Sequence, residues 1–472
     1  MTPDLEARFR ALVSERDALD ADAAALKLRE PRGLYHGQAA LVLTPRTVEQ
    51  VSAILALAYE TEVAVVPQGG NTGLVGGQTP SPDGAQILLS TAKLDRIREV
   101  DTDGALMVVE AGVTLQRAQE AAAEAGRLFP LSLGSEGSCT IGGNIATNAG
   151  GTAVLAYGNM RDLVLGVEAV LPDGRVWNGL RRLRKDNTGY DLKHLFIGSE
   201  GTLGVVTAAV LKLYPAPRET ATALVGLASP QAAVALFRIA RAHAGPALTG
   251  CELMPRIGLD FTFRHMAGTR DPLEAAHAWY ILLELSSPLE GGLSETLETI
   301  LGEAFEAGVV EDAAIAASGE QAQAFWRIRH GLSEVQGHEG GSIKHDVSVP
   351  LATVADFVTE ATEAVAAHAP DARVVAFGHI GDGNIHFNVS QPVGADKAAY
   401  LAGWDAMNRV VHAVVARHGG SVAAEHGVGR LKNGLLAEVK SDVELDLMRA
   451  VKRALDPKGL LNPGAILAET RP

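Results

Sequence analysis

Hydrophobic residues recur along this 472-residue chain in two spacings, one typical of helices and one typical of strands. Near the N-terminus, Leu5, Phe9, Leu12 and Val13 lie three or four positions apart. That spacing places them on one face of a helix, so the first 35 residues or so are predicted to be helical.

The next segment has the pattern of a strand, a helix and a second strand. Residues 41–43 are apolar, and Thr47 can cap a helix that carries apolar residues on one face. Residues 63–66 form a second apolar run, which Pro67 ends. The segment is therefore predicted to be a β-α-β unit that leads into a glycine-rich loop.

Further strand patterns follow in ILLST, LMVVEAG, VLGVEAVLPDGRVW and GVVTAAVLKLYP, with a helix predicted from Thr114 to about Gly126. Glycine density falls after about residue 204, and Pro215 and Pro217 mark a boundary. Alanine-rich helices then alternate with strands. We predict an α+β protein with domains at 1–217, 218–418 and 419–472, the last mostly helical.

Composition and charge argue against several classes of protein. A 47% hydrophobic content allows a large core, and a net charge of -15 disfavours nucleic-acid binding. The basic run at 181–185 is interpreted as a solvated loop. Cys139 and Cys251 are too few for a disulfide scaffold. The chain shows no secretory signal and no apolar run of bilayer-spanning length, so a cytoplasmic protein is expected.

Three glycine-rich segments stand out in the first half: PQGGNTGLVGG, LGSEGSCTIGGNIATNAGG and FIGSEGTLGVVT. Because glycine has no Cβ, backbone N–H groups in such loops can approach a pyrophosphate. Tight turns without a ligand explain each loop alone, but explain all three together poorly. The chain contains neither G-x-G-x-x-G nor G-x-x-x-x-G-K-[ST], so a Rossmann fold and a P-loop are not supported.

A histidine cluster lies far from these loops. In the strand pattern 384–389, His386 and Asn388 alternate with apolar residues and share one face. A Gly-Asp-Gly turn can bring His379 near His386, and Glu425 and His426 form another polar group. Two imidazoles and a carboxylate leave coordination positions open, which is typical of a catalytic metal site. A lone histidine is more often structural, and that interpretation is kept for His36, His338, His368, His412 and His418.

These motifs resemble the vanillyl-alcohol oxidase / p-cresol methylhydroxylase superfamily over essentially the whole chain, and PQGGNTGLVGG is most similar to its D-2-hydroxyglutarate dehydrogenases. The resemblance implies an FAD-binding domain of the p-cresol methylhydroxylase type. It also implies a ferredoxin-like α+β substrate domain and a C-terminal segment packed back on the FAD domain. Asn71 stands in the first loop where a tethering His would be, so FAD is expected to be non-covalent.

The resemblance also implies which residues hold the cofactor. In the first loop they are Pro67, Gly69, Gly70, Asn71, Thr72, Gly73, Leu74, Gly76 and Gly77. In the second they are Ser135, Gly142, Gly143, Asn144, Thr147, Asn148 and Gly150. Later in the chain they are Glu200, Gly201, Val206 and Asn462.

The motifs G-H-x-G-D-G-N-x-H and E-H-G-x-G resemble the family's metal and base motifs. This implies that His379, His386 and Glu425 bind a divalent metal, for which zinc is favoured, and that His426 is the base. The family's substrate positions are matched by Arg329, Ser333 (where threonine is usual), Lys344 and Asn388, with Arg327 as the rival of Arg329.

The expected reaction is oxidation of a D-2-hydroxy acid, with a dicarboxylic acid such as D-2-hydroxyglutarate favoured by Arg329 and Lys344. The alternatives are a D-lactate or glycolate dehydrogenase, a metal-dependent hydrolase, and a binding module that keeps a flavin fold. The electron acceptor, whether an electron-transfer flavoprotein, a cytochrome or a quinone, is left open. A homodimer is allowed for.

Overall fold

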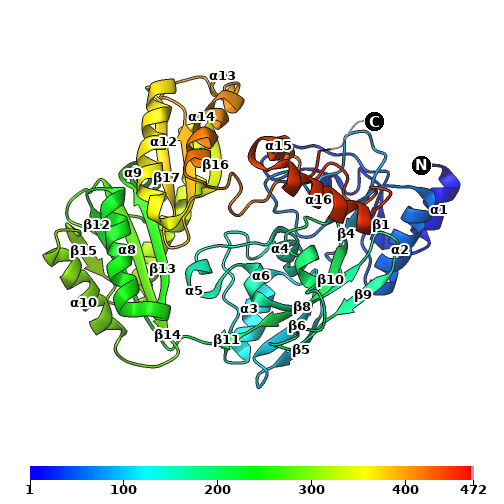
Figure 1. Ribbon diagram of the computed structural model, residues 1–472, viewed down its shortest axis with the longest axis horizontal. Coiled ribbons are helices and arrows are strands. Elements are labelled where there is room, and N and C mark those ends of the chain that lie inside the picture. Colours follow the sequence, from blue (N-terminus) through cyan, green and yellow to red (C-terminus); the bar gives the residue numbers. More distant parts are fainter. Residues whose placement is uncertain (469–472) are drawn as a thin grey trace. The chain divides into compact units, whose positions relative to one another are not determined.

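The computed structural model describes residues 1–468 (Figure 1). Packing divides the chain into two units. The first contains Met1–Gly150, Gly158–Ala216 and the chain from Glu425 on, and the second contains Gly151–Tyr157 and Pro217–Ala424. Among the described residues, no helix is both long and apolar enough to cross a bilayer.

A four-stranded sheet in the first unit contains the predicted β-α-β unit. Its order is β1-β2-β4-β3, with strands Ala18–Leu19, Leu41–Leu43, Ile87–Ser90 and Val65–Gln68. The strands β2, β4 and β3 run parallel. Helix α2 (Val48–Thr61) crosses between β2 and β3, and the Thr47 side chain caps it by accepting a hydrogen bond from the N–H of Gln50. The predicted β-α-β unit is confirmed, but its second strand covers Val65–Gln68 rather than 63–66 and includes Pro67.

The second sheet of this unit has five antiparallel strands in the order β5-β6-β10-β8-β9. Their bounds are Ile97–Asp101, Leu106–Glu110, Val205–Lys212, Val164–Val170 and Val176–Gly179. The short strands β7 (Arg127–Leu128) and β11 (Tyr214–Pro215) pair separately. The helices here are α3 (Leu115–Glu124), α4 (Ile141–Thr147), α6 (Met160–Leu163) and α7 (Lys193–Phe196).

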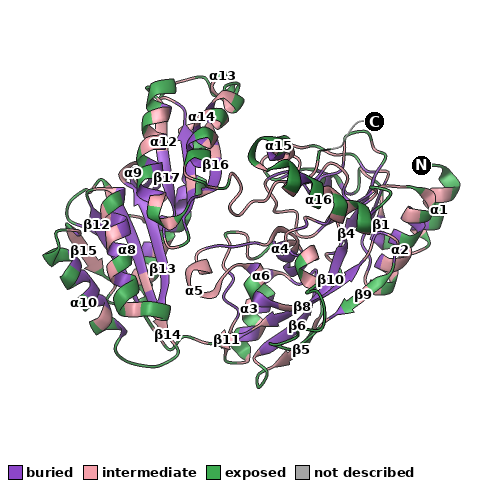
Figure 2. Ribbon diagram, in the orientation of Figure 1, coloured by how far each residue is buried: buried purple, intermediate pink, exposed green. Residues whose placement is uncertain are grey.

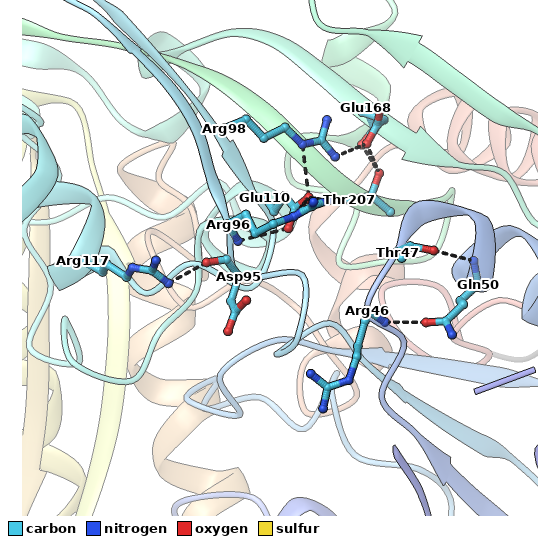
Figure 3. A network of polar contacts seen from close by, with 10 residues as sticks. All are labelled: Arg46, Thr47, Gln50, Asp95, Arg96, Arg98, Glu110, Arg117, Glu168 and Thr207. Atoms are coloured by element: carbon cyan, nitrogen blue, oxygen red, sulfur yellow. Dashed lines mark hydrogen bonds and ion pairs between the residues drawn. The ribbon is translucent and has the colours of Figure 1, made fainter. Parts of the chain in front are cut away.

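An ion-pair network crosses the five-stranded sheet (Figure 3). The buried carboxylate of Glu110 accepts hydrogen bonds from the guanidinium groups of Arg96, at 2.7 Å, and Arg98, at 3.2 Å. Arg98 also reaches Glu168, which accepts a hydrogen bond from the Thr207 hydroxyl. Each buried carboxylate in the network thus has charged or polar partners, as a buried charge requires.

The N-terminal prediction is wrong beyond the first turns. Helix α1 covers only Pro3–Arg10, and irregular turns and strand β1 follow it. A tertiary contact explains why the helix does not continue. The Arg46 guanidinium holds Asp17 through two hydrogen bonds of 2.7 and 2.9 Å. Asp17 is thereby fixed next to β1, which pairs with β2.

The second unit is built on one seven-stranded antiparallel sheet, whose inner strands are mostly buried (purple in Figure 2) and whose edge strand β15 has no buried residue. Its order is β15-β12-β14-β13-β17-β18-β16, with strands Asp312–Ile315, Glu219–Leu227, Trp279–Ser287, Leu248–Pro255, Arg373–His379, Asn384–Ser390 and Ser342–Ser348. The first four strands, with α8 (Pro230–Ala244) and α10 (Leu293–Glu306), follow the β-α-β-β-α-β order of a ferredoxin-like fold.

Helices cover both faces of this sheet. One face packs against α8, α10, α12 (Val354–His368) and α14 (Trp404–Arg417). The other packs against α9 (Arg256–His265) and α11 (Gly319–Val335). The short helices α5 (Val154–Tyr157) and α13 (Lys397–Leu401) complete the unit. Because both faces are covered, polar residues on the sheet are held in a dry environment.

The unit boundaries differ from the predicted domains at two places. The predicted boundary at 418 falls at 424, because Ser421 pairs with Ser348 of β16 through backbone bonds of 2.7 and 3.0 Å. Residues 151–157 belong to the second unit, where α5 packs against β13. The C-terminal segment carries α15 (Leu436–Val439) and α16 (Asp442–Leu455), and it is tied to the first unit where Asn462 N–H donates to the Val65 oxygen, at 2.8 Å.

Candidate functional site

The first unit contains a cavity of about 430 Å³ whose wall is formed by all three glycine-rich segments. A volume of this size is within the range of small-molecule and cofactor sites. Glu425 and His426, from the start of the C-terminal segment, also line it. The two motifs that seemed unrelated in sequence, the glycine loops and E-H-G-x-G, therefore contribute to one cavity.

Two glycines of the first loop are required because the second loop packs directly against them. A Cβ on Gly69 would lie 2.4 Å from the Thr140 hydroxyl oxygen, and a Cβ on Gly70 would lie 1.9 Å from the backbone oxygen of Ser138. Both distances are shorter than any tolerated contact. These glycines therefore allow the two loops to meet, which forms the wall of the cavity.

Most of the predicted cofactor residues line this cavity. They are Pro67, Gly69, Gly70, Asn71, Thr72, Gly73, Leu74, Gly77, Ser135, Gly142, Gly143, Asn144, Thr147, Gly150, Glu200, Gly201 and Val206. Sequence analysis missed several wall residues. They include Gln68, Gln78, Thr91, Leu133 and Thr140. Gln68, between two predicted residues, could have been found from its position in the loop.

Three predicted cofactor residues lie behind the cavity wall. Gly76, with a φ of +72°, packs against the Tyr35 ring. The Asn148 side chain accepts a hydrogen bond from the N–H of Arg161, at 2.9 Å. The Asn462 amide donates to the backbone oxygens of Gly77, at 2.9 Å, and Glu200, at 2.7 Å. These three residues fix the loops, and their direct contact with the cofactor stays a prediction.

The cavity wall fits FAD on a further observation. The side-chain oxygens of Gln68 and Asn71 are buried and, within residues 1–468, have no hydrogen-bond donor. A buried acceptor without a donor costs about 1–3 kcal/mol. The N–H and O–H groups of a flavin, its ribityl chain and its adenine are donors that can satisfy such acceptors.

Glu200 has a role that sequence analysis did not anticipate. Its carboxylate accepts hydrogen bonds from the backbone N–H groups of Val428, at 2.7 Å, and Gly429, at 2.8 Å. Burial raises the pKa of Glu200, and these two N–H donors oppose that effect. Glu200 therefore holds the backbone two and three residues after His426, at the same cavity wall.

The second unit brings the predicted metal and substrate residues onto one face of its sheet. In the register, Lys344 is opposite Asn388, and His386 is opposite both Asp346 and Phe377. The opposite partner of His379 on β13 is Glu252. Directly opposed residues of an antiparallel pair point to the same face. That face is the one covered by α9 and α11.

The two histidines adjoin, as the period-two pattern and the Gly-Asp-Gly turn predict. Their ring centroids are 5.7 Å apart. His379 Nδ1 lies 2.7 Å from Oε1 of Glu252, and His386 Nδ1 lies 3.8 Å from Oδ1 of Asp346. Histidine ligands of metals commonly use their second nitrogen in this way, on a carboxylate. In this arrangement, Nε2 is the nitrogen of His379 that could hold a metal ion.

Glu252 is the functional residue that sequence analysis missed. It is buried, and its second oxygen accepts a hydrogen bond of 2.7 Å from the Arg329 guanidinium. Burial alone raises its pKa, but the charges and hydrogen bonds of His379 and Arg329 outweigh burial and lower the pKa to about 2. Glu252 is therefore ionised at neutral pH.

Arg329, a predicted substrate anchor, is held by a buried carboxylate. Its guanidinium is ion-paired with Glu252 and lies 5.0 Å from the Phe377 ring centroid. A buried arginine with this partner is part of the support for His379. The rival Arg327 is exposed and donates to the backbone oxygen of Ala267, at 3.0 Å.

The other predicted substrate residues are brought together. Lys344 Nζ donates to the backbone oxygen of Ser333, at 3.2 Å. The Asn388 amide donates to Gln336 Oε1, at 3.0 Å, which fixes its orientation. Arg329 and Ser333 are one turn apart on α11. A lysine, a serine and an oriented amide thus form a polar group beside the histidine pair.

Two family models match the chain. The model described as "FAD binding domain" matches residues 39–179, and the model described as "FAD linked oxidases, C-terminal domain" matches residues 216–466. The second covers more than half of the chain. The glycine-loop region is therefore an FAD-binding domain.

Curated relatives extend this match. Mitochondrial D-2-hydroxyglutarate dehydrogenase of Bos taurus is 40% identical over 432 residues, which is 91% of this chain and 77% of the relative. A Schizosaccharomyces pombe protein that carries the name of a mitochondrial D-lactate dehydrogenase is 36% identical over 439 residues, 91% of this chain and 82% of the relative.

Solved structures share the fold. Substrate-bound p-cresol methylhydroxylase has a TM-score of 0.77 at 16% identity, covering 99% of this chain and 97% of that chain. At that identity the likeness establishes architecture alone, and the predicted fold class is confirmed. The family models and the curated relatives together show that the chain belongs to the FAD-linked D-2-hydroxy acid dehydrogenases.

Proposed function

We propose that this enzyme oxidises D-2-hydroxyglutarate to 2-oxoglutarate with non-covalently bound FAD. The observation that supports this substrate best is the position of Lys344, in contact with Ser333 and opposite Asn388 on the sheet face that carries His379 and His386. One face of the second unit thus offers a metal-binding pair and a cationic group, which suit an alcohol with a carboxylate at each end.

We assign His379, His386 and Glu425 as ligands of a divalent metal. Nitrogen and carboxylate ligands favour zinc. When bound, the metal would lower the pKa of the substrate hydroxyl and orient the substrate. Glu252 would orient His379, and Arg329 would keep Glu252 ionised.

His426 is assigned as the base that takes the hydroxyl proton. It lines the FAD cavity, and Glu200 fixes the backbone that follows it. When bound, FAD accepts the hydride. Non-covalent binding stays a prediction, which rests on Asn71 in the first glycine-rich loop. Burial raises the pKa of the Cys139 thiol, which disfavours the thiolate that a covalent link needs.

A substrate panel tests the proposal. Turnover with an artificial electron-accepting dye is measured for D- and L-2-hydroxyglutarate, D-lactate and glycolate. The proposal expects kcat/KM to be highest for D-2-hydroxyglutarate. A higher kcat/KM for D-lactate or glycolate would assign the rival dehydrogenase, and dye reduction by none of the four would reject the oxidation itself.

Other features stay predictions. Electrons from the reduced flavin would pass to an electron-transfer flavoprotein, a cytochrome or a quinone. Cytoplasmic location and a homodimer are also retained as predictions. The names of the two curated relatives both contain the word mitochondrial.

A further inference from the structure

A second cavity in the first unit, of about 350 Å³, is dominated by positive charge. It lies where β8 begins and β10 ends. Its ionisable wall residues are Arg161, Asp162, Arg184, Lys193, His194 and Lys212. Four permanent cations and a histidine thus surround one carboxylate, in a chain whose net charge is -15. The basic run at 181–185, interpreted from sequence as a solvated loop, contributes Arg184 to this wall.

Arg161 is held rigidly in this wall. Its guanidinium donates to the backbone oxygens of Ile197, at 2.7 Å, and His194, at 3.3 Å. Its backbone N–H donates to the side chain of Asn148, the residue that ends helix α4 of the second glycine-rich loop. The guanidinium is therefore oriented by neutral oxygens, which leave its charge uncompensated.

The cavity lacks the carboxylates that would neutralise its cations. Within residues 1–468, Arg161, Arg184 and Lys212 form no ion pair, although Lys212 donates to the backbone oxygen of Asp162. Lys193 is paired with Asp191. Three cations of this wall thus have no carboxylate partner.

The electrostatics of the wall reflect this imbalance. Burial lowers the pKa of Lys212, and the charges of Arg184 and Lys193 add to that effect, while Asp162 opposes it. Burial also lowers the pKa of His194, and Lys193 adds to it. The groups thus disfavour one another's charged forms, a cost that a bound anion would remove.

We propose that this cavity binds a phosphate group, with Arg161, Arg184 and Lys212 as its ligands. Arginine offers a planar fork that fits two phosphate oxygens, and lysine offers a point charge. Three cations from separate segments suit a dianion with three free oxygens. The cavity is larger than one phosphate, so the group belongs to a larger phosphate monoester, either a soluble one or the headgroup of phosphatidic acid.

Calorimetry on the FAD-loaded enzyme tests the proposal. Inorganic phosphate is titrated at constant ionic strength, with sodium chloride as the reference salt. In a second arm, phosphatidylcholine vesicles containing phosphatidic acid are sedimented with the enzyme. The variants are R184Q/K212Q, in the proposed site, and R238Q, a control on the exposed surface of α8.

The expected result is saturable phosphate binding that weakens at least about tenfold in R184Q/K212Q and is unchanged in R238Q. If the wild-type enzyme sediments with the vesicles and R184Q/K212Q does not, the ligand is a lipid headgroup. If the wild type binds inorganic phosphate but does not sediment with the vesicles, the ligand is a soluble molecule. The proposal is overturned if neither phosphate nor vesicles bind beyond the sodium chloride reference, or if R184Q/K212Q binds as the wild type does.

Discussion

Nδ1 of His379 lies 2.7 Å from Oε1 of Glu252, a residue 127 positions earlier in the chain. The other oxygen of Glu252 accepts a hydrogen bond from Arg329. The three residues form a buried chain from guanidinium to carboxylate to imidazole, which fixes the orientation of the imidazole. This relationship gives Arg329 a supporting role for His379, while its role as a substrate anchor stays a prediction.

Replacing Glu252 by glutamine should weaken metal binding. The amide keeps the shape of the carboxylate but removes the charge that orients His379, so zinc affinity is expected to fall about 10- to 100-fold. The measurement is zinc titration of the chelated enzyme, with the FAD content checked in parallel. The control is E284Q, because Glu284 is a half-buried glutamate on the adjacent strand that bonds Trp326 rather than a histidine. Equal zinc affinity in E252Q and wild type would remove Glu252 from the metal site.

Lys344 should discriminate between substrates. If its ammonium binds a distal carboxylate, K344A loses a charged hydrogen bond of about 1.5–3 kcal/mol with D-2-hydroxyglutarate but not with D-lactate. We expect kcat/KM to fall roughly 10- to 100-fold for D-2-hydroxyglutarate and less than about threefold for D-lactate. Steady-state kinetics on both substrates give the comparison. Equal losses of kcat/KM on the two substrates would mean that Lys344 has a structural role, through its hydrogen bond to the backbone oxygen of Ser333.

Glu200 should position His426. In E200Q the amide nitrogen cannot accept a hydrogen bond, so the N–H of Val428 or Gly429 loses its partner. We expect kcat to fall about tenfold or more through misplacement of the base, with FAD retained. Flavin absorbance and a kcat–pH profile are recorded alongside turnover. The control E438Q changes an exposed glutamate of the same C-terminal segment. Loss of FAD with an unchanged rate per bound flavin would instead make Glu200 a cofactor residue.

Glu110 should make stability depend on pH in the acid range. Burial raises its pKa, but Arg96 and Arg98 outweigh burial and hold the pKa below its ordinary value of 4.5. A lowered carboxyl pKa stabilises the folded state above the ordinary value, and this contribution is lost as the pH falls through the folded-state pKa. At pH 7, E110Q should lower the free energy of unfolding by about 1–3 kcal/mol.

Urea denaturation of wild type and E110Q at about pH 7 and about pH 3 measures this effect. The difference between the two proteins should narrow at the lower pH, because the wild-type carboxyl becomes protonated. A difference that stays constant between the two pH values would contradict the ion-pair account of Glu110.

Local patterns predicted the parts of the fold that local residues decide. The β-α-β unit near Thr47 and the shared face of His386 and Asn388 follow from apolar spacing, and both are found. The predicted N-terminal helix is too long. The helical spacing of apolar residues continues past Arg10, but the helix ends there, and Arg46 holds Asp17 beside β1. A distant ion pair overrides local spacing there.

The site was predictable only where a motif marked it. The glycine loops and the histidine pair carry such motifs. Glu252 does not, because its partners lie 77 and 127 positions away and a single glutamate in an apolar strand gives no sign of them. Likewise, Asn148 and Asn462 resemble cofactor ligands in sequence, but only the structure shows that they bond to backbone groups behind the wall.

The most direct test is anaerobic reduction of the bound flavin by D-2-hydroxyglutarate, followed by rapid-scanning absorbance. It is made on the metal-loaded enzyme, after exhaustive chelation, and after zinc is restored. The account predicts fast bleaching of oxidised flavin in the loaded enzyme, loss of most of that rate after chelation, and recovery with zinc. Bleaching at the full rate in the chelated enzyme, or no bleaching in the loaded one, would contradict it.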